Sequence, residues 1–85
     1  MWIEHNNCLT ATFRFRNFTE AWAFMSEVAF AAERADHHPN WSNVYNTVKI
    51  DLTTHDAGNT VTEKDRRLAA IITSIVAKYA TESVA

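Results

Sequence analysis

Three of the four histidines in this chain, His37, His38 and His55, lie in one short stretch of sequence. His37 and His38 are adjacent and precede Pro39, and His55 follows the last predicted strand. Histidine exchanges protons near neutral pH because its ordinary pKa is about 6.5. Several histidines in one place can supply both the acid and the base of a reaction. From residue types alone, separate surface or capping histidines, a catalytic or binding cluster and a metal site all remain open.

A metal site is the least favoured of these interpretations. Zinc sites recruit ligands at spacings such as Cys-x-x-Cys or His-x-x-x-His, and two adjacent histidines do not readily turn both rings towards one ion. The single cysteine, Cys8, is far from the three histidines in the sequence, and we expect it to be a small, partly buried residue near the start of a strand. We therefore expect no metal at this site.

Three acidic residues accompany the histidines. Glu33 falls in the last turn of a predicted helix, where an acid is usually solvated although the helix dipole disfavours it. Asp36 either orients a neighbouring histidine or ends the helix. Asp65 follows Thr62 at the spacing of a helix cap, and we expect capping rather than chemistry to be its role.

The elements that must position these residues are predicted from hydrophobic periodicity. Apolar and polar residues alternate from Leu9 to Phe15, which predicts a strand with one buried face. Apolar residues then recur at helical spacing and form the main apolar stripe of a helix: Phe18, Ala21, Trp22, Met25, Val28, Ala29 and Ala32. This helix must end before Pro39, because proline disfavours helical geometry in the residue ahead of it. We predict a tight turn at Tyr45-Asn46. The predicted elements are strands at 2–4, 9–15, 41–45 and 47–54, and helices at 18–35 and from about 62 to 80.

This order, β-α-β-β-α, predicts a two-layer α+β fold: an antiparallel sheet with the helices packed on one face. In this layout the connection after the first helix lies beside the end of the last strand, so His37, His38 and His55 are able to line one pocket. We expect Trp41 and Tyr45 to belong to the core rather than to form stacking platforms.

The composition indicates one small domain spanning residues 1–85. A chain of this length buries a limited core, so stabilisation by association is expected. The formal net charge of −2, with no basic run longer than Arg66-Arg67, argues against direct nucleic acid binding. The sequence shows no apolar stretch long enough to span a membrane and no signal-peptide pattern, and one cysteine fits a reducing compartment. We expect a soluble cytoplasmic protein.

The histidines and acids together resemble the signature of a known family, the pterin-4a-carbinolamine dehydratases. That signature is an acid, three residues, His-His-Pro, an aromatic residue, a later histidine and an aspartate. Here it reads Glu33, Arg34-Ala35-Asp36, His37-His38-Pro39, Tyr45, His55 and Asp65. Further matches cover nearly the whole chain: Trp2, Phe15, Phe18, Val28-Ala29, Ala32-Glu33, Trp41, Tyr45-Asn46, Thr54-His55-Asp56, Gly58 and Leu68-Ala69.

The sequence departs from this family in two places. Family members usually carry a helical segment before the position of Trp2, which is absent here. The turn after His55 usually has paired glycines followed closely by Leu-Thr or Leu-Ser. Here it reads Ala57-Gly58-Asn59-Thr60-Val61-Thr62, one residue longer, so we expect this wall of the pocket to differ in shape.

The resemblance implies an enzyme, a 4a-hydroxytetrahydrobiopterin dehydratase that acts in tetrahydrobiopterin recycling and needs no metal or redox cofactor. It removes water from the carbinolamine left by aromatic amino-acid hydroxylases and gives quinonoid dihydropterin. The resemblance places His38 and His55 near the leaving hydroxyl, with His37 as the partner base. The residues it implies for binding the pterin are Glu33, Asp36, His37, His38, Pro39, Thr54, His55, Asp56 and Ala57.

The alternative is a non-enzymatic interaction module. The family includes a protein that stabilises dimers of a homeodomain transcription factor, and its fold assembles into dimers and tetramers through its helices. In this chain Phe24 and Phe30 fall outside the main apolar stripe of the first helix. An exposed Phe30 would indicate a subunit contact, whereas a Phe30 covered by a neighbouring loop would not. We expect a homodimer or homotetramer.

Overall fold

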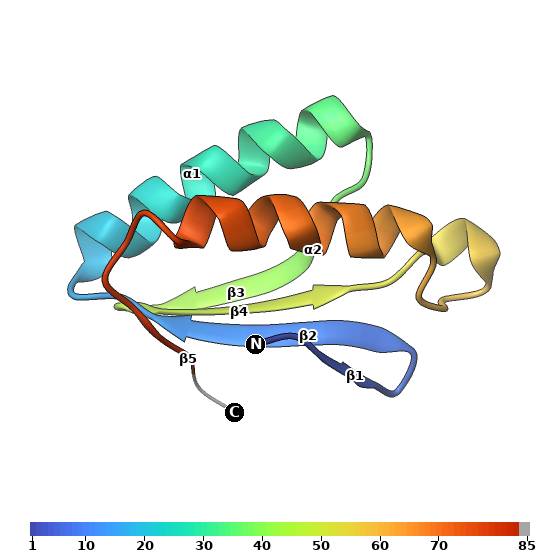
Figure 1. Cartoon of the computed structure of the whole chain (residues 1–85), viewed down its shortest axis with the longest axis horizontal. Helices are drawn as coiled ribbons and strands as arrows, with labels where there is room; N and C mark the ends of the chain where they lie inside the picture. The colour runs from blue at the N-terminus through green and yellow to red at the C-terminus, as the bar shows by residue number, and fades with distance from the viewer. Residues whose placement is uncertain (84–85) are drawn as a thin grey trace.

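A computed structural model describes residues 1–83 of the chain. It consists of an antiparallel sheet with two helices on one face (Figure 1). The predicted α+β fold is confirmed. The helices are α1 (Phe18–Ala35) and α2 (Glu63–Val76), with a short 3-10 helix η1 (His55–Ala57) between β4 and α2. The strands are β1 (Ile3–His5), β2 (Cys8–Arg14), β3 (Asn40–Val44), β4 (Thr47–Leu52) and β5 (Glu82–Ser83).

The sheet has the strand order β1-β2-β4-β3. β4 pairs with residues 9–14 of β2, while β1 and β5 share the other edge of β2. Helix α1 carries the chain from β2 across to β3, and β4 returns between them. The last turn of α1, the end of β4, η1 and the start of α2 therefore meet at one end of the molecule, on the right in Figure 1.

The core lies between the sheet and the helices. The period of two in β2 and β4 turns their buried residues towards the helices, and Phe13 packs edge to face against Phe24 of α1 with 5.8 Å between ring centroids. Burial of each large apolar side chain stabilises the fold by about 1.5–3 kcal/mol. The buried strand residues are Leu9, Ala11, Phe13, Val48, Ile50 and Leu52.

The prediction that Phe24 lies outside the buried stripe of α1 is wrong. Phe24 is fully buried, whereas Phe18 and Trp22, which the periodicity places in the stripe, are about half exposed. Apolar residues occur nearly all round α1, so periodicity alone does not determine which face is buried. The rings of Phe13 and Phe15 determine which face of α1 is buried. Phe13 contacts Phe24 from β2, and Phe15 contacts it from the segment that follows β2.

Helix α2 ends at Val76 rather than near Ala80. The Tyr79 N–H donates to the Val76 carbonyl (3.0 Å) in a turn that follows the helix. This turn places the Tyr79 ring against Phe15 and lets its hydroxyl donate to Glu27 (2.6 Å). The hydrogen bond to Glu27, together with burial, raises the pKa of Tyr79 to about 12.

No helix within residues 1–83 is long and apolar enough to cross a membrane.

The two aromatic residues predicted for the core differ in burial. Trp41 on β3 is half-buried and packs against the core, as predicted. Tyr45 is 63% exposed, so that prediction is wrong. Tyr45 occupies the predicted tight turn between β3 and β4 with a φ of 52°, and a turn outside the sheet gives its ring no buried surface to contact.

Candidate active site

The histidine pair follows directly from the way α1 ends. Asp36 adopts the left-handed conformation with a φ of 51°, and its N–H donates to the Glu33 carbonyl (3.1 Å). The His37 N–H donates to the Ala32 carbonyl (3.1 Å). These two bonds form the Schellman arrangement, which satisfies the last carbonyls of a helix. They fix the His37 backbone at the end of α1.

His37 is held by a buried carboxylate on α2. Its Nε2 lies 2.6 Å from Asp65 Oδ1, the His37 side chain is 11% exposed, and Asp65 is fully buried. The other carboxylate oxygen, Oδ2, accepts from the Thr62 N–H (2.9 Å) and from the Thr54 hydroxyl (2.7 Å). Asp65 therefore caps α2, as predicted, and at the same time connects α2 to His37 and to the end of β4.

The charge of Asp65 is stabilised by these contacts. Burial on its own would raise the pKa of the carboxyl, but hydrogen bonds from His37, the Thr62 N–H and the Thr54 hydroxyl outweigh burial and lower the pKa of Asp65 below its ordinary value. A fixed negative charge consequently lies beside the His37 ring. Such a carboxylate orients an imidazole and stabilises its protonated form, as in other histidine–aspartate pairs.

The other two histidines have partners nearer the surface. His38 Nε2 lies 2.9 Å from Glu33 Oε1, and both side chains are exposed. His55 opens η1, and its Nδ1 lies 3.1 Å from Asn59 Oδ1 in the following turn.

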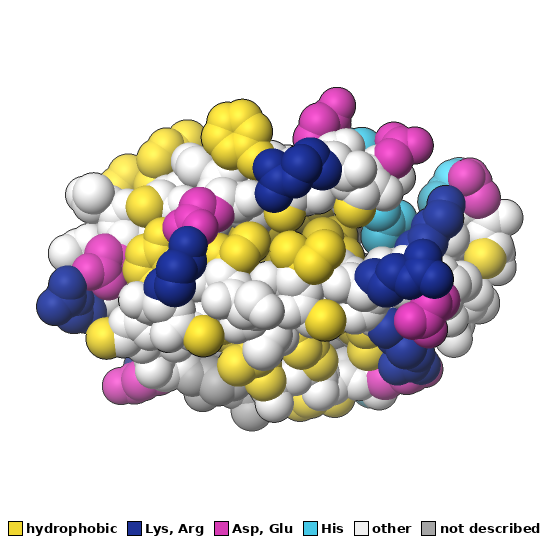
Figure 2. All heavy atoms as spheres, turned by 45° about the horizontal axis from the view of Figure 1, so that its top comes forward, with side chains coloured by type: hydrophobic (Ala, Val, Ile, Leu, Met, Phe, Trp, Pro, Cys, Tyr) yellow, Lys and Arg dark blue, Asp and Glu magenta, His cyan; other side chains and the backbone are white. Residues whose placement is uncertain are grey.

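These groups surround a small polar cleft of about 140 Å³. Figure 2 shows histidine side chains in a hollow near one end of the molecule, with acidic and basic side chains on either side. The lining comes from the α1–β3 connection, the end of β4, η1 and the first turn of α2. The lining residues are Asp36, His37, His38, Thr53, Thr54, His55, Asp56 and Lys64.

The family model described as pterin 4 alpha carbinolamine dehydratase matches residues 1–75 of this chain. The chain belongs to this family. Two relatives bear provisional pterin-4-alpha-carbinolamine dehydratase names. One, from Prochlorococcus marinus, is 49% identical over 75 residues, which cover 88% of this chain and 78% of that protein. The other, from Nitrobacter winogradskyi, is 57% identical over 73 residues, which cover 86% and 71%.

Solved structures of pterin dehydratase type share the fold. One from Brucella melitensis, described as a transcriptional coactivator/pterin dehydratase, has a TM-score of 0.82 and 39% sequence identity, over 87% of this chain and 80% of that one. Another, described as a pterin dehydratase-like protein and RuBisCO assembly factor in the alpha-carboxysome, has a TM-score of 0.71 and 22% identity, over 88% and 86%. The second likeness shows the fold alone.

The cleft brings together most of the residues that the dehydratase signature indicates. Three of the predicted binding residues do not line it. Glu33 is exposed beside His38, Pro39 is half-buried just after the pair, and Ala57 is exposed at the end of η1. The six that do line it are Asp36, His37, His38, Thr54, His55 and Asp56.

Three features of the cleft are absent from the sequence-based prediction. Thr53 and Lys64 line it, and neither belongs to a motif that could have revealed this position. The pairing of Asp65 with His37 joins residues that are far apart in the sequence. The final aspartate of the dehydratase signature was the one available signal for this pairing, and the cap spacing gave Asp65 a simpler explanation.

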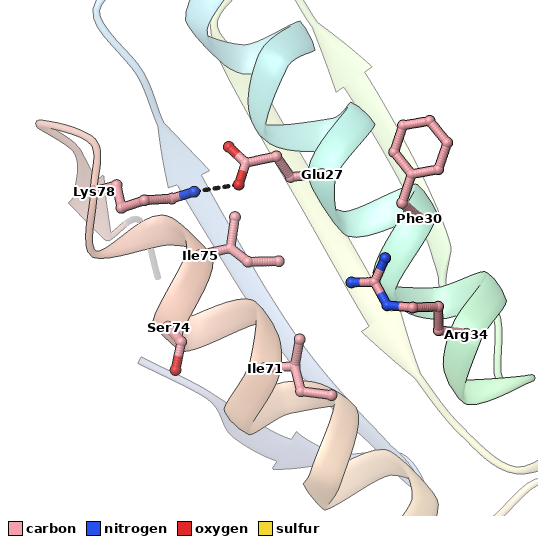
Figure 3. A pocket seen from close by; sticks show the side chains of 7 residues that line it. All are labelled: Glu27, Phe30, Arg34, Ile71, Ser74, Ile75 and Lys78. Atoms are coloured by element: carbon pink, nitrogen blue, oxygen red, sulfur yellow. Dashed lines mark hydrogen bonds and ion pairs between the residues drawn. The ribbon is translucent and has the colours of Figure 1, made fainter.

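A larger groove lies away from the histidines. It has a volume of about 580 Å³ and runs between the outer faces of α1 and α2. Figure 3 shows Phe30 on α1, Ile71 and Ile75 extending from α2, and the ion pair between Lys78 and Glu27. Its lining has no histidine, so this larger groove is not the place where the histidines gather.

The residues from 1 to 83 include no group of three or more histidine, cysteine or acidic side chains arranged to hold a metal ion.

Proposed function

We propose that this chain catalyses the dehydration of a 4a-hydroxytetrahydropterin, with 4a-hydroxytetrahydrobiopterin as the substrate in tetrahydrobiopterin recycling. The observation that carries the proposal is the His37–Asp65 pair, at 2.6 Å, in one cleft with His38 and His55. This arrangement supplies several proton-exchanging groups at a single concave site, in a family named for this reaction.

The proposed reaction needs one proton donor and one proton acceptor. The C4a–O bond breaks while a proton is added to the hydroxyl, which leaves as water. The ring N5–H loses its proton, and its bonding electrons form the C4a=N5 double bond of the quinonoid product. Hydroxide is a poor leaving group at neutral pH, so protonation by an imidazolium lowers the barrier.

The three histidines divide these tasks in our proposal. His38 and His55 lie near the leaving hydroxyl, and one of these two rings, in its protonated form, donates the proton to it. His37 takes the ring proton, because the ionised Asp65 beside it stabilises the imidazolium that results. A cleft of about 140 Å³ suits a flat ring rather than a drug-sized ligand, so the pterin side chain would extend into solvent. Polar groups of Asp36, Thr54 and Asp56, which line the cleft, would hold the edge of the ring.

We expect the purified protein to accelerate dehydration of synthetic 4a-hydroxytetrahydropterin and to keep its full rate in the presence of a chelator. Imidazole groups alone supply the proton transfers of the proposed mechanism. Absorbance of the quinonoid product, followed with and without the chelator, measures the rate of dehydration and the effect of the chelator on it. Loss of the rate in the chelator and its return with zinc would replace the histidine mechanism with Lewis-acid catalysis.

We further propose that the chain associates through the outer faces of α1 and α2, as a homodimer at least. Phe30 of α1 is 68% exposed and Ile71 of α2 is exposed, so the groove presents large apolar side chains to solvent, among the charged side chains of Glu27, Arg34 and Lys78. Burial of this surface between two copies removes it from water. The alternative function, binding of a protein partner, would use the same face.

Replacing Phe30 with Glu is expected to shift the assembly towards smaller species. The fold should stay intact, because the Phe30 side chain is not part of the core. Light scattering at micromolar concentration measures the mass, and one chain weighs 9.7 kDa. Ile3→Glu makes the same change at a 51% exposed residue on β1, away from this groove, and serves as the matched control. A wild-type mass of one chain at every concentration, or an unchanged assembly in Phe30→Glu, would contradict the proposed interface.

A further inference from the structure

The turn that follows η1 holds a side chain against His55. Asn59 Oδ1 lies 3.1 Å from His55 Nδ1, and Asn59 belongs to the segment Ala57-Gly58-Asn59-Thr60, where the sequence departs from the dehydratase signature. Paired glycines at this turn would offer no side chain to His55. The contact is therefore a feature of this chain's own residues.

The backbone of the turn fixes Asn59 firmly. Its N–H donates to the Thr54 carbonyl (3.0 Å), and the Thr54 N–H donates to the Thr60 carbonyl (2.9 Å), which closes the turn as a small bridge. Asn59 has a φ of 61°, a left-handed conformation that asparagine and glycine adopt more readily than other residues. Thr54 is also the residue that donates to Asp65, so one rigid segment supports both His55 and the His37–Asp65 pair.

The contact has a direct chemical consequence for the His55 ring. The Asn59 atom that faces the ring is the amide oxygen, which only accepts hydrogen bonds, so this geometry favours a proton on Nδ1 that is donated to Asn59 Oδ1. In neutral His55 the lone pair then resides on Nε2. A neutral imidazole without such a partner favours the opposite form, with the proton on Nε2, and the hydrogen bond made by one ring nitrogen determines the form adopted.

We infer that Asn59 is a positioning residue for His55: it fixes the ring orientation and makes Nε2 the nitrogen that exchanges a proton with the substrate. This inference rests on the proposed dehydratase function. After a protonated His55 gives its Nε2 proton to the leaving hydroxyl, the neutral ring is left in the form that Asn59 already stabilises. Proton return from solvent to Nε2 then restores the acid without rotation of the ring.

Two substitutions separate this role from loop folding. Asn59→Gly removes the acceptor while glycine adopts a φ of 61° without strain. Asn59→Asp keeps an acceptor oxygen and also tolerates the left-handed conformation. We expect Asn59→Gly to lower kcat by about twofold to tenfold, the effect of one neutral hydrogen bond, with little change in KM. Asn59→Asp should retain most of kcat, which a loosened loop alone would not explain.

Ring ¹⁵N NMR of His55 provides the decisive readout, and it requires no turnover. We expect neutral His55 to carry its proton on Nδ1 in the wild type and in Asn59→Asp, and on Nε2 in Asn59→Gly. A wild-type ring protonated on Nε2, or the same ring form and kcat in Asn59→Gly as in the wild type, would overturn the inference. If the ring form switches as expected but the wild type fails to dehydrate the carbinolamine, the positioning of His55 stands and the proposed function alone is lost.

Discussion

Replacing His38 or His55 with Ala is expected to lower the rate of carbinolamine dehydration by about 10²–10⁴-fold, the usual contribution of a general acid or base. Both rings line the cleft but lie near the surface, where they contact only Glu33 and Asn59 through hydrogen bonds. Their removal should therefore leave the free energy of unfolding nearly unchanged. Initial rates and a denaturant titration of each variant measure the two quantities.

The fourth histidine offers a matched control for this experiment. His5 is exposed on β1, outside the cleft, so His5→Ala should keep the wild-type rate. Near-wild-type turnover in both His38→Ala and His55→Ala would rule out the proposed histidine mechanism. An equal loss in His5→Ala would show that the effect does not depend on the cleft.

Replacing Asp65 with Ala is expected to lower the free energy of unfolding by about 2–4 kcal/mol, because the partly or fully buried donors of His37, Thr54 and Thr62 would all lose this acceptor. The dehydration rate should fall as well, since His37 would lose the charge that orients it. Denaturant titrations of wild type and variant measure the loss of stability. Glu63→Gln changes an exposed acid in the same helical turn and should have a small effect.

The same carboxylate predicts how stability depends on pH. The folded-state pKa of Asp65 is lower than its ordinary value of 3.8, so its ionised form stabilises the fold above that value. This contribution is lost as the pH falls through the folded-state pKa. The stability difference between wild type and Asp65→Asn should therefore be largest near neutral pH and shrink in acid. A difference that stays constant from neutral pH to well below 3.8 would show that the charge of Asp65 is not responsible.

The sequence was most informative where one face of an element is apolar and the other is polar. The strand alternation in β2 and β4 and the cap spacing of Asp65 correctly predicted both strands and the start of α2. Helix α1 is apolar on nearly every side, and the burial of Phe24 instead of Trp22 depends on the rings of the sheet beneath it. Periodicity describes one element at a time, so it could not choose between these faces.

In the site, too, the sequence predicted the histidines of a known motif but not the contacts between separate elements. The dehydratase signature brought His37, His38 and His55 together in the prediction, and the cleft contains all three. The contact of Asn59 with His55 arises from the longer turn, whose shape only the structure gives. The placement of Lys64 in the cleft depends on how α2 begins beside η1, which no local pattern encodes.

The central claim is that the histidine cleft, rather than the larger groove between α1 and α2, binds the pterin. Titration of ¹⁵N-labelled protein with a stable dihydropterin, followed by NMR, tests it most directly. We predict that the largest shift changes fall on the rings of His37, His38 and His55 and on the Thr54 amide, with the resonances of Phe30 and Ile75 unchanged. Changes confined to Phe30, Ile71 and Ile75, or no change at millimolar pterin, would contradict this account.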